Sequence, residues 1–190
     1  MSNSTQYTRT DKAIQSALMQ LVSRKPFEKI TVQDILDETP VSRATFYKHY
    51  HDKYEIVEKL QAEFLQIQRE VILPLSRKSS QEILTITKQQ SAYYRQVMRC
   101  LLKVHTENVD LTKGLMNELQ TYYLRNCDSP TREIEARIFG GTLSSFQIAC
   151  LDEDTSQMDF GQVMCNVMFR CLGLENDTAA LEFMQERLRR

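Results

Sequence analysis

Apolar residues recur at three- and four-residue spacing along almost the whole chain, which is the pattern of amphipathic helices. One such stripe predicts a first helix from Thr10 to Arg24, capped by Thr8 or Thr10 and ended by Pro26. Its apolar members are Ile14, Ala17, Leu18, Leu21 and Val22. The alternating pattern of strands is hard to find, so the sequence predicts an all-α fold.

Closely spaced helix starts follow this first helix. Thr31 and Ser42 are predicted to cap two short helices, and Asp52 with Glu55 has the pattern of a capping box for a third. From Asp52 the apolar spacing continues without a breaker to Pro74, which predicts one long helix. We therefore expect a compact helical unit that a long helix joins to the rest of the chain.

The remainder of the chain has the same helical periodicity. Further helices are predicted at about 81–90, 92–105, 108–126, 131–151 and 159–172, with a last one from about 178. The expected domains are residues 1–54 and a helical body of residues 55–190, with the long helix from about 53 between them.

Composition excludes several classes of protein. A net charge of −1 and a pI near 6.3 mean that any DNA contact must come from a local basic patch. No apolar N-terminal run or membrane span is found, so we expect a cytoplasmic protein without a membrane partner. The cysteines are odd in number and lack a C-x-x-C pair, which predicts buried thiols in a reducing compartment: Cys100, Cys127, Cys150, Cys165 and Cys171.

The segment 30–54 has the layout of two short helices around a tight turn. A helix that reads the major groove keeps one face apolar while its other residues reach base edges and phosphates. The apolar face is predicted to hold Val41, Phe46 and Tyr50. The stretch 41–54 is locally cationic, with Arg43, Lys48 and Lys53 against Asp52. This pattern favours a helix-turn-helix that binds DNA.

At these residues the chain resembles the TetR family, whose N-terminal pattern is close to T-v-x-d-I-a-x-x-a-G-v-S-x-x-T-x-Y-x-H-F-x-x-K. The resemblance covers about residues 10–60. It implies a three-helix DNA-binding domain followed by a helical domain for ligand binding and dimerisation. The matching residues are Thr31, Val32, Gln33, Asp34, Ile35, Val41, Ser42, Arg43, Ala44, Thr45, Phe46, Tyr47, Lys48, His49, Tyr50 and Lys53.

The resemblance also implies roles for individual residues. Gln33 and Arg43 occupy positions that can read bases, and other members of the motif occupy positions that usually hold phosphates: Thr45, Tyr47, His49 and Lys53. His49 has an equal alternative as an ordinary surface histidine, and Tyr50 is expected in the core. The full predicted DNA-binding set is Thr31, Gln33, Ser42, Arg43, Ala44, Thr45, Tyr47, Lys48, His49 and Lys53.

The chain departs from the family pattern in the turn. The family usually has Gly there, whereas this sequence has Pro40, whose ring fixes φ near −65°. Thr39 before it is pushed toward an extended conformation. We expect the first short helix to end early and the angle of the reading helix to change.

The body is expected to hold an effector pocket. Candidate lining residues are aromatic, Met and polar side chains of the middle helices, although plain core is the alternative for each of them. They are Tyr93, Tyr94, Met98, His105, Met116, Tyr122, Tyr123 and Phe139. The effector is expected to be a small molecule, with a protein partner or no effector as the alternatives.

A dimer interface is predicted from two helices with wide apolar or small-residue faces. The helix at 131–151 would contribute Ile134, Ile138, Gly141, Ser145 and Ile148. The helix at 159–172 would contribute Phe160, Val163, Met164, Val167, Met168 and Cys171. The alternative is that other parts of the same chain cover both of these faces.

These features predict a transcriptional regulator, expected to be a repressor, that binds double-stranded operator DNA as a homodimer. A co-regulator switched by a protein partner is one alternative. A helical enzyme or binding module is another, and it lacks any catalytic signature. No cofactor is expected. No metal is expected either, because the chain's histidines have no metal-ligand spacing: His49, His51 and His105.

Overall fold

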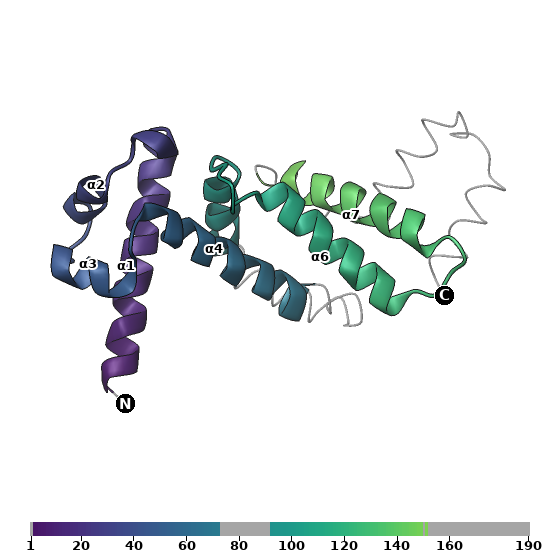
Figure 1. Ribbon diagram of the computed structural model, residues 1–190, viewed down its shortest axis with the longest axis horizontal. Helices are drawn as coiled ribbons and strands as arrows, with labels where there is room; N and C mark the ends of the chain where they lie inside the picture. Colours follow the sequence, from purple (N-terminus) through teal and green to yellow (C-terminus); the bar gives the residue numbers. More distant parts are fainter. Residues whose placement is uncertain (1, 73–91, 150, 152–190) are drawn as a thin grey trace. The chain divides into compact units, whose positions relative to one another are not determined.

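The computed structural model describes residues 2–72, 92–149 and 151 of the chain (Figure 1). The chain divides into two compact units, residues 1–145 and 146–190. Every regular element in the described residues is helical, which confirms the all-α prediction.

The N-terminal elements are α1 (Ser2–Arg24), the 3₁₀ turn η1 (Phe27–Lys29), α2 (Val32–Asp37), α3 (Arg43–His49) and α4 (Lys53–Ile67). Helix α1 begins at Ser2, so the predicted start at Thr10 is wrong. The residues before Thr10 include neither Gly nor Pro, and nothing in them interrupts a helix. Helix α2 ends at Asp37, ahead of the Pro40 turn.

Side-chain caps begin the short helices where the sequence predicted them. Thr31 Oγ1 accepts from the backbone N–H of Asp34 at 3.2 Å, and Asp34 Oδ2 accepts from the backbone N–H of Thr31 at 2.7 Å. Ser42 Oγ accepts from the backbone N–H of Thr45 at 3.2 Å. Each contact satisfies a backbone donor that the first turn of a helix leaves free.

The capping box predicted between Asp52 and Glu55 is corrected. Asp52 Oδ1 caps α4 by accepting from the backbone N–H groups of Tyr54 at 2.8 Å and Glu55 at 3.0 Å. The Glu55 carboxylate accepts instead from the N–H of His51 at 2.7 Å, one residue before the cap. The reciprocal box is found at α2, between Thr31 and Asp34.

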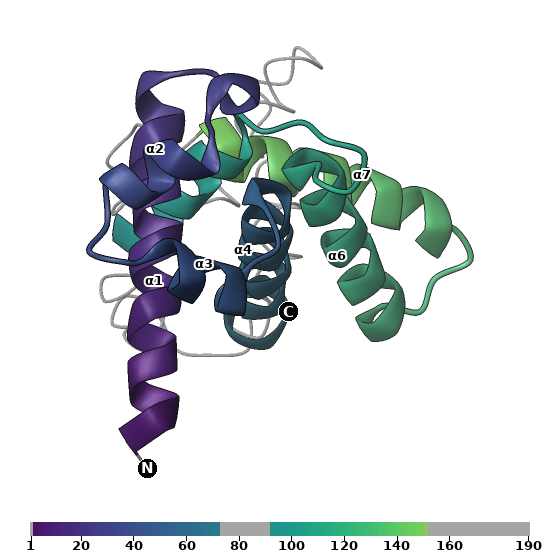
Figure 2. The same cartoon turned by 60° about the vertical axis from the view of Figure 1, so that its left-hand side comes forward.

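The core of the N-terminal domain lies where α2, α3 and α4 pack against α1 (Figures 1 and 2). Each element contributes fully buried apolar side chains, each of which stabilises the fold by about 1.5 to 3 kcal/mol. They include Ile14, Leu18, Ile35, Phe46 and Ile56. The short helices α2 and α3 are therefore held in place by packing on α1 and α4, since isolated helices of this length are unstable.

The second half of the described chain consists of a helix at 92–101, α6 (Leu111–Asn126) and α7 (Arg132–Ala149). Asp110 Oδ1 caps α6 by accepting from the N–H of Lys113 at 3.0 Å. Helices α6 and α7 lie side by side, as both views show (Figures 1 and 2). Gly140 permits this approach, because a Cβ atom there would lie 2.8 Å from the carbonyl oxygen of Met116.

The predicted helix boundaries need small corrections. The helix expected at 92–105 ends at 101, and those expected at 108–126 and 131–151 are α6 and α7. The long helix expected to run to Pro74 continues beyond α4 as a wider π turn, η2 (Gln68–Ile72). The helices predicted at 81–90, at 159–172 and from 178 lie outside the described residues.

Candidate nucleic-acid interface

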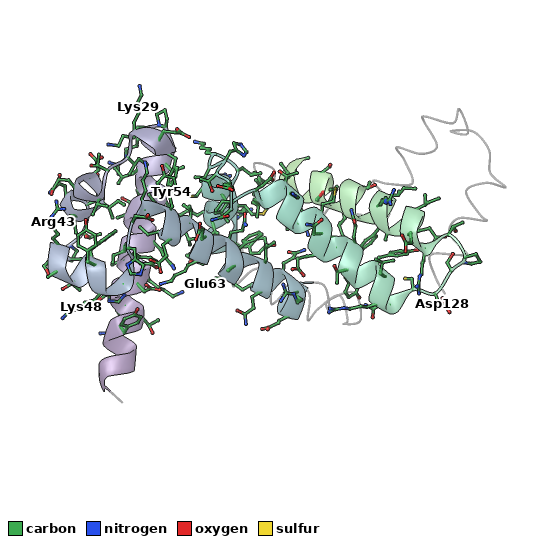
Figure 3. All side chains as sticks on the ribbon, viewed as in Figure 1. Lys29, Arg43, Lys48, Tyr54, Glu63 and Asp128 are labelled. Carbon is green, nitrogen blue, oxygen red and sulfur yellow. The ribbon has the colours of Figure 1, made fainter. Side chains whose placement is uncertain are left out.

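Helix α3 has one buried side and one exposed side. Phe46 and Tyr50, four residues apart, are 0% and 1% exposed and anchor the helix to the domain core. On the opposite side Arg43 and Lys48 are exposed, and Figure 3 shows both on α3. Tyr47 is 48% exposed beside them. The helix therefore presents two cations and an aromatic hydroxyl to solvent, as the sequence predicted for a reading helix.

Arg43 is joined to α2 by side-chain hydrogen bonds. Its Nη2 donates to Gln33 Oε1 at 2.5 Å, and Gln33 Nε2 donates to Asp37 Oδ1 at 2.7 Å. All three residues are exposed. The predicted base-reading residues Gln33 and Arg43 are thus brought together, with Asp37 as a third member that sequence reasoning missed.

Hydroxyl groups surround the starts of α2 and α3. Thr31 and Ser42 are exposed, and Ser42 Oγ lies 2.9 Å from Thr45 Oγ1. Thr31 Oγ1 donates to Asp34 Oδ2 at 2.7 Å. Bonds to Lys25 and Thr31 lower the pKa of Asp34 from 3.8 to about 2, so the Asp34 carboxyl group is ionised at neutral pH.

Two cations near α2 form ion pairs with carboxylates. Arg24 pairs with Glu38 at 2.8 Å, and Lys25 pairs with Asp34 at 2.8 Å. In the described part of the chain no acidic side chain pairs with Lys48. The charge of Lys48 is therefore available to an external anion.

Lys53 has a different environment from the one predicted. Its Nζ donates to the backbone carbonyls of Phe27 at 2.8 Å, Glu28 at 2.9 Å and Ile30 at 2.8 Å, and the residue is 9% exposed. It also lies 4.7 Å from the centroid of the Phe27 ring. Burial lowers the pKa of the ammonium from its ordinary value of 10.5.

The phosphate contact predicted for Lys53 is therefore corrected to an internal role, because all three protons of the ammonium are donated within the domain. A second lysine of α4 has a related position. Lys59 Nζ donates to the carbonyl of His49 at 2.9 Å and lies 4.4 Å from the centroid of the Tyr50 ring. The two ammonium groups connect α4 to the segment before α2 and to the end of α3.

His49 is also directed inward. Its side chain is 4% exposed, its Nδ1 lies 3.3 Å from Asp11 Oδ1, and its ring stacks on Tyr7 at a centroid distance of 3.9 Å. The predicted phosphate contact of His49 is therefore corrected to packing between α3 and α1. The one-turn spacing of Tyr7 and Asp11 was the only sequence signal for this contact.

Two of the predicted effector residues lie at one described pocket. Tyr93 and Tyr94 line a pocket of about 60 Å³ together with Lys12, Glu63 and Phe64. The Tyr94 ring stacks on Phe64 at 4.4 Å, and its hydroxyl donates to the buried side chain of Gln68. The remaining predicted residues do not line this pocket: Met98, His105, Met116, Tyr122, Tyr123 and Phe139.

Those remaining residues have varied surroundings. Met98 is buried in the core, whereas His105 is exposed. Tyr123 of α6 and Phe139 of α7 have ring centroids 5.3 Å apart, and the Tyr123 hydroxyl donates to Glu135 at 2.7 Å. Met116 and Tyr122 are half-buried on α6.

The predicted dimer residues of α7 form an exposed stripe. Ile134 and Ile138 are 61% and 62% exposed, and Ser145 is exposed two turns further along. A Cβ atom on Gly141 would have no described atom within 4 Å. Ile148 is half-buried. The other predicted interface residues lie outside the described residues: Phe160, Val163, Met164, Val167, Met168 and Cys171.

In the described ranges no helix has the length and apolarity required to cross a membrane. No group of His, Cys, Asp or Glu side chains in the same ranges could hold a metal ion.

Comparison with known proteins identifies the N-terminal domain. Residues 14–60 match the bacterial regulatory proteins of the tetR family. This range contains the C-terminal part of α1 and all of α2 and α3, and it extends into α4. A search of curated proteins gives no match to the chain.

Proposed function

We propose that this chain, whose residues 14–60 match the bacterial regulatory proteins of the tetR family, is a DNA-binding transcription regulator of that family and a cytoplasmic repressor. It binds double-stranded operator DNA as a homodimer, and a small-molecule effector switches it. Residues 1–54 form the DNA-binding domain, and residues 55–190 form the effector and dimerisation domain. The protein is a binding protein and has no catalytic role.

The observation that carries this proposal is the exposed side of α3. Arg43 stands at the first position of the helix, where its guanidinium can donate two hydrogen bonds to a guanine edge. Lys48 and Tyr47 lie further along the exposed side and can contact phosphates. The proposed DNA-contacting set is Thr31, Ser42, Arg43, Ala44, Thr45, Tyr47 and Lys48, with Gln33 bonded to Arg43.

The stripe on α7 supports a homodimer. Exposed Ile134 and Ile138 are followed by Gly141, and a glycine inside a helix costs about 0.5 to 1 kcal/mol relative to alanine. No described neighbour of Gly141 requires a missing side chain, so close approach by a second copy supplies the reason. A two-fold dimer also doubles the phosphate contacts, since each protomer contributes one α3.

The second interface helix of the proposal is the one at 159–172. Its contribution comes from the apolar residues named above, and it would form a four-helix bundle with α7 and the same two helices of a second copy. In the DNA-bound dimer the two α3 helices would be separated by about one DNA turn, roughly 34 to 36 Å.

The effector would act by changing this separation. Tyr93 and Tyr94 lie against α4, the helix that follows the DNA-binding domain, so an effector bound beside them would act on that helix. A co-regulator of the same fold that responds to a protein partner is the alternative. An assay of operator release distinguishes the two modes. A small molecule releases the DNA in the first mode, and a protein from the cell releases it in the second.

A mobility-shift titration tests the proposed function. The full chain is mixed with the intergenic DNA upstream of its own gene and with a scrambled duplex of the same length and composition. We expect a discrete complex with two protomers per site on the upstream DNA, at concentrations where the scrambled duplex stays free. Equal retardation of both duplexes would contradict an operator-binding regulator.

A further inference from the structure

The side chains of Asp37, Gln33 and Arg43 form a chain of hydrogen bonds from α2 to the first residue of α3. Gln33 and Asp37 are one helical turn apart on α2, and Arg43 lies across the Pro40 turn. The bonds are 2.7 Å from Gln33 Nε2 to Asp37 Oδ1 and 2.5 Å from Arg43 Nη2 to Gln33 Oε1.

The order of donors and acceptors in this chain follows from its two charged ends, Asp37 and Arg43. An ionised carboxylate only accepts hydrogen bonds, so the amide of Gln33 must turn its NH₂ group toward Asp37. Its carbonyl oxygen then faces the guanidinium of Arg43, which only donates. Asp37 and Arg43 therefore require the same orientation of the Gln33 amide, and Asp37 holds it from the side of α2.

We propose that Gln33 is a positioning residue, which holds the Arg43 guanidinium in place for a guanine, and that Asp37 orients Gln33 for this task. The inference rests on the proposed function and concerns its sequence preference. Gln33 uses one guanidinium N–H, and the other donors of Arg43 stay free for a base edge.

This assignment changes the role of Gln33 from reader to support. A glutamine that reads adenine uses its carbonyl oxygen and its NH₂ group together. Here the oxygen is occupied by Arg43 and one amide proton by Asp37. The base preference at this position therefore belongs to Arg43, and Gln33 acts through it.

The expected size of the effect comes from the freedom of the arginine side chain. Ordering a flexible side chain before binding improves affinity by about two- to tenfold, and here the gain applies to the base pair that Arg43 contacts in each half-site. Because the three residues are exposed, their bonds contribute little to stability, and substitutions are expected to leave the fold intact.

The experiment compares the sequences that variants select from a library of randomised DNA duplexes. The full natural chain and Arg43→Ala define the base pair that Arg43 reads. Gln33→Met removes the acceptor, and Asp37→Asn removes the group that orients the amide. Gln66→Met is the matched control, because Gln66 Nε2 at the end of α4 donates to Glu70 of η2 at 3.1 Å, also four residues away and distant from α3.

We expect Gln33→Met to lower preference about two- to tenfold at the same base pair that Arg43→Ala affects. Asp37→Asn should lower it less, at the same position. Gln33→Glu keeps an acceptor for Arg43, so it should retain the preference while its added negative charge weakens binding to every duplex. Gln66→Met should select the natural sequence.

The inference is overturned if Gln33→Met alters a base pair that Arg43→Ala leaves unchanged, because Gln33 would then read its own base. It is also overturned if Gln33→Met leaves every preference as it is in the natural chain. If the natural chain enriches no sequence from the library, the proposed function itself fails, so the two failures are distinguishable.

Discussion

Replacing Lys53 with Met should destabilise the N-terminal domain without changing how strongly salt weakens DNA binding. Its ammonium donates to three carbonyls at 2.8 to 2.9 Å, and the residue is 9% exposed. A hydrogen bond from a charged donor contributes about 1.5 to 3 kcal/mol, and the cost of burying the ammonium offsets part of the sum. We expect a net loss of about 3 kcal/mol in the free energy of unfolding.

Thermal and urea unfolding, followed by circular dichroism, measure this loss. For a chain of this size 3 kcal/mol corresponds to a decrease in Tm of about 6 to 12 °C. Lys53→Arg is the matched variant, because it retains the charge but its planar guanidinium cannot direct donors at three carbonyls as an ammonium does. It should therefore be destabilised as well.

The salt dependence of DNA binding completes the test. Lys48→Ala should reduce the slope of log affinity against log salt by about 1 per half-site, because Lys48 is available to a phosphate. Lys53→Met, measured below its Tm, should leave the slope unchanged. A Lys53→Met variant of natural stability with a reduced slope would refute the internal role and restore the phosphate contact.

Further expectations concern α7 and the cap of α2. Gly140→Ala should lower the free energy of unfolding by about 1 kcal/mol, because its Cβ would meet the Met116 carbonyl at 2.8 Å; a urea titration that shows no loss would contradict the packing of α6 on α7. Ile138→Glu should yield monomers in sedimentation, and an unchanged dimer would relocate the interface. The low pKa of Asp34 contributes stability that is complete above 3.8 and is lost as the pH falls toward about 2. Asp34→Asn should remove this dependence in urea titrations across that range, and a full acid dependence in the variant would assign it to other carboxylates.

Local features of the DNA-binding domain were predictable because they depend on neighbours in sequence. Thr31, Ser42 and Asp52 cap the helices that follow them, and a cap needs only a short polar side chain and the next turn. The inward side of α3 was also predictable, since Phe46 and Tyr50 have helical spacing. These signals are enough to locate the reading helix and its exposed side.

The partners of Lys53 and His49 could not be predicted from sequence. Both contacts join segments more than 20 residues apart, and the acceptors of Lys53 are backbone carbonyls, which every residue has. The local charge pattern gives the same expectation for an inward and an outward lysine. Only the position of η1 beside the start of α4 distinguishes them.

The start of α1 shows a different limit. Thr8 and Thr10 are good caps, but a cap is used only where the chain before it leaves the helix. Here the preceding residues continue the helix to Ser2. A cap residue therefore predicts where a helix can begin, and the packing of the preceding segment decides whether it does.

The lysine contacts of α4 have a mechanical consequence. Lys53 bonds the start of α4 to the carbonyls before α2, and Lys59 bonds the next turn of α4 to the end of α3. The beginning and the end of the segment that holds α2 and α3 are therefore both attached to α4. Helix α4 can then transmit a displacement from its far end to α2 and α3. Its 15 residues make it about 22 Å long. Pushing its far end sideways by about 2 Å tilts it by roughly 5°. Because both lysines bond α4 to these segments, we expect α2 and α3 to turn with it through the same angle.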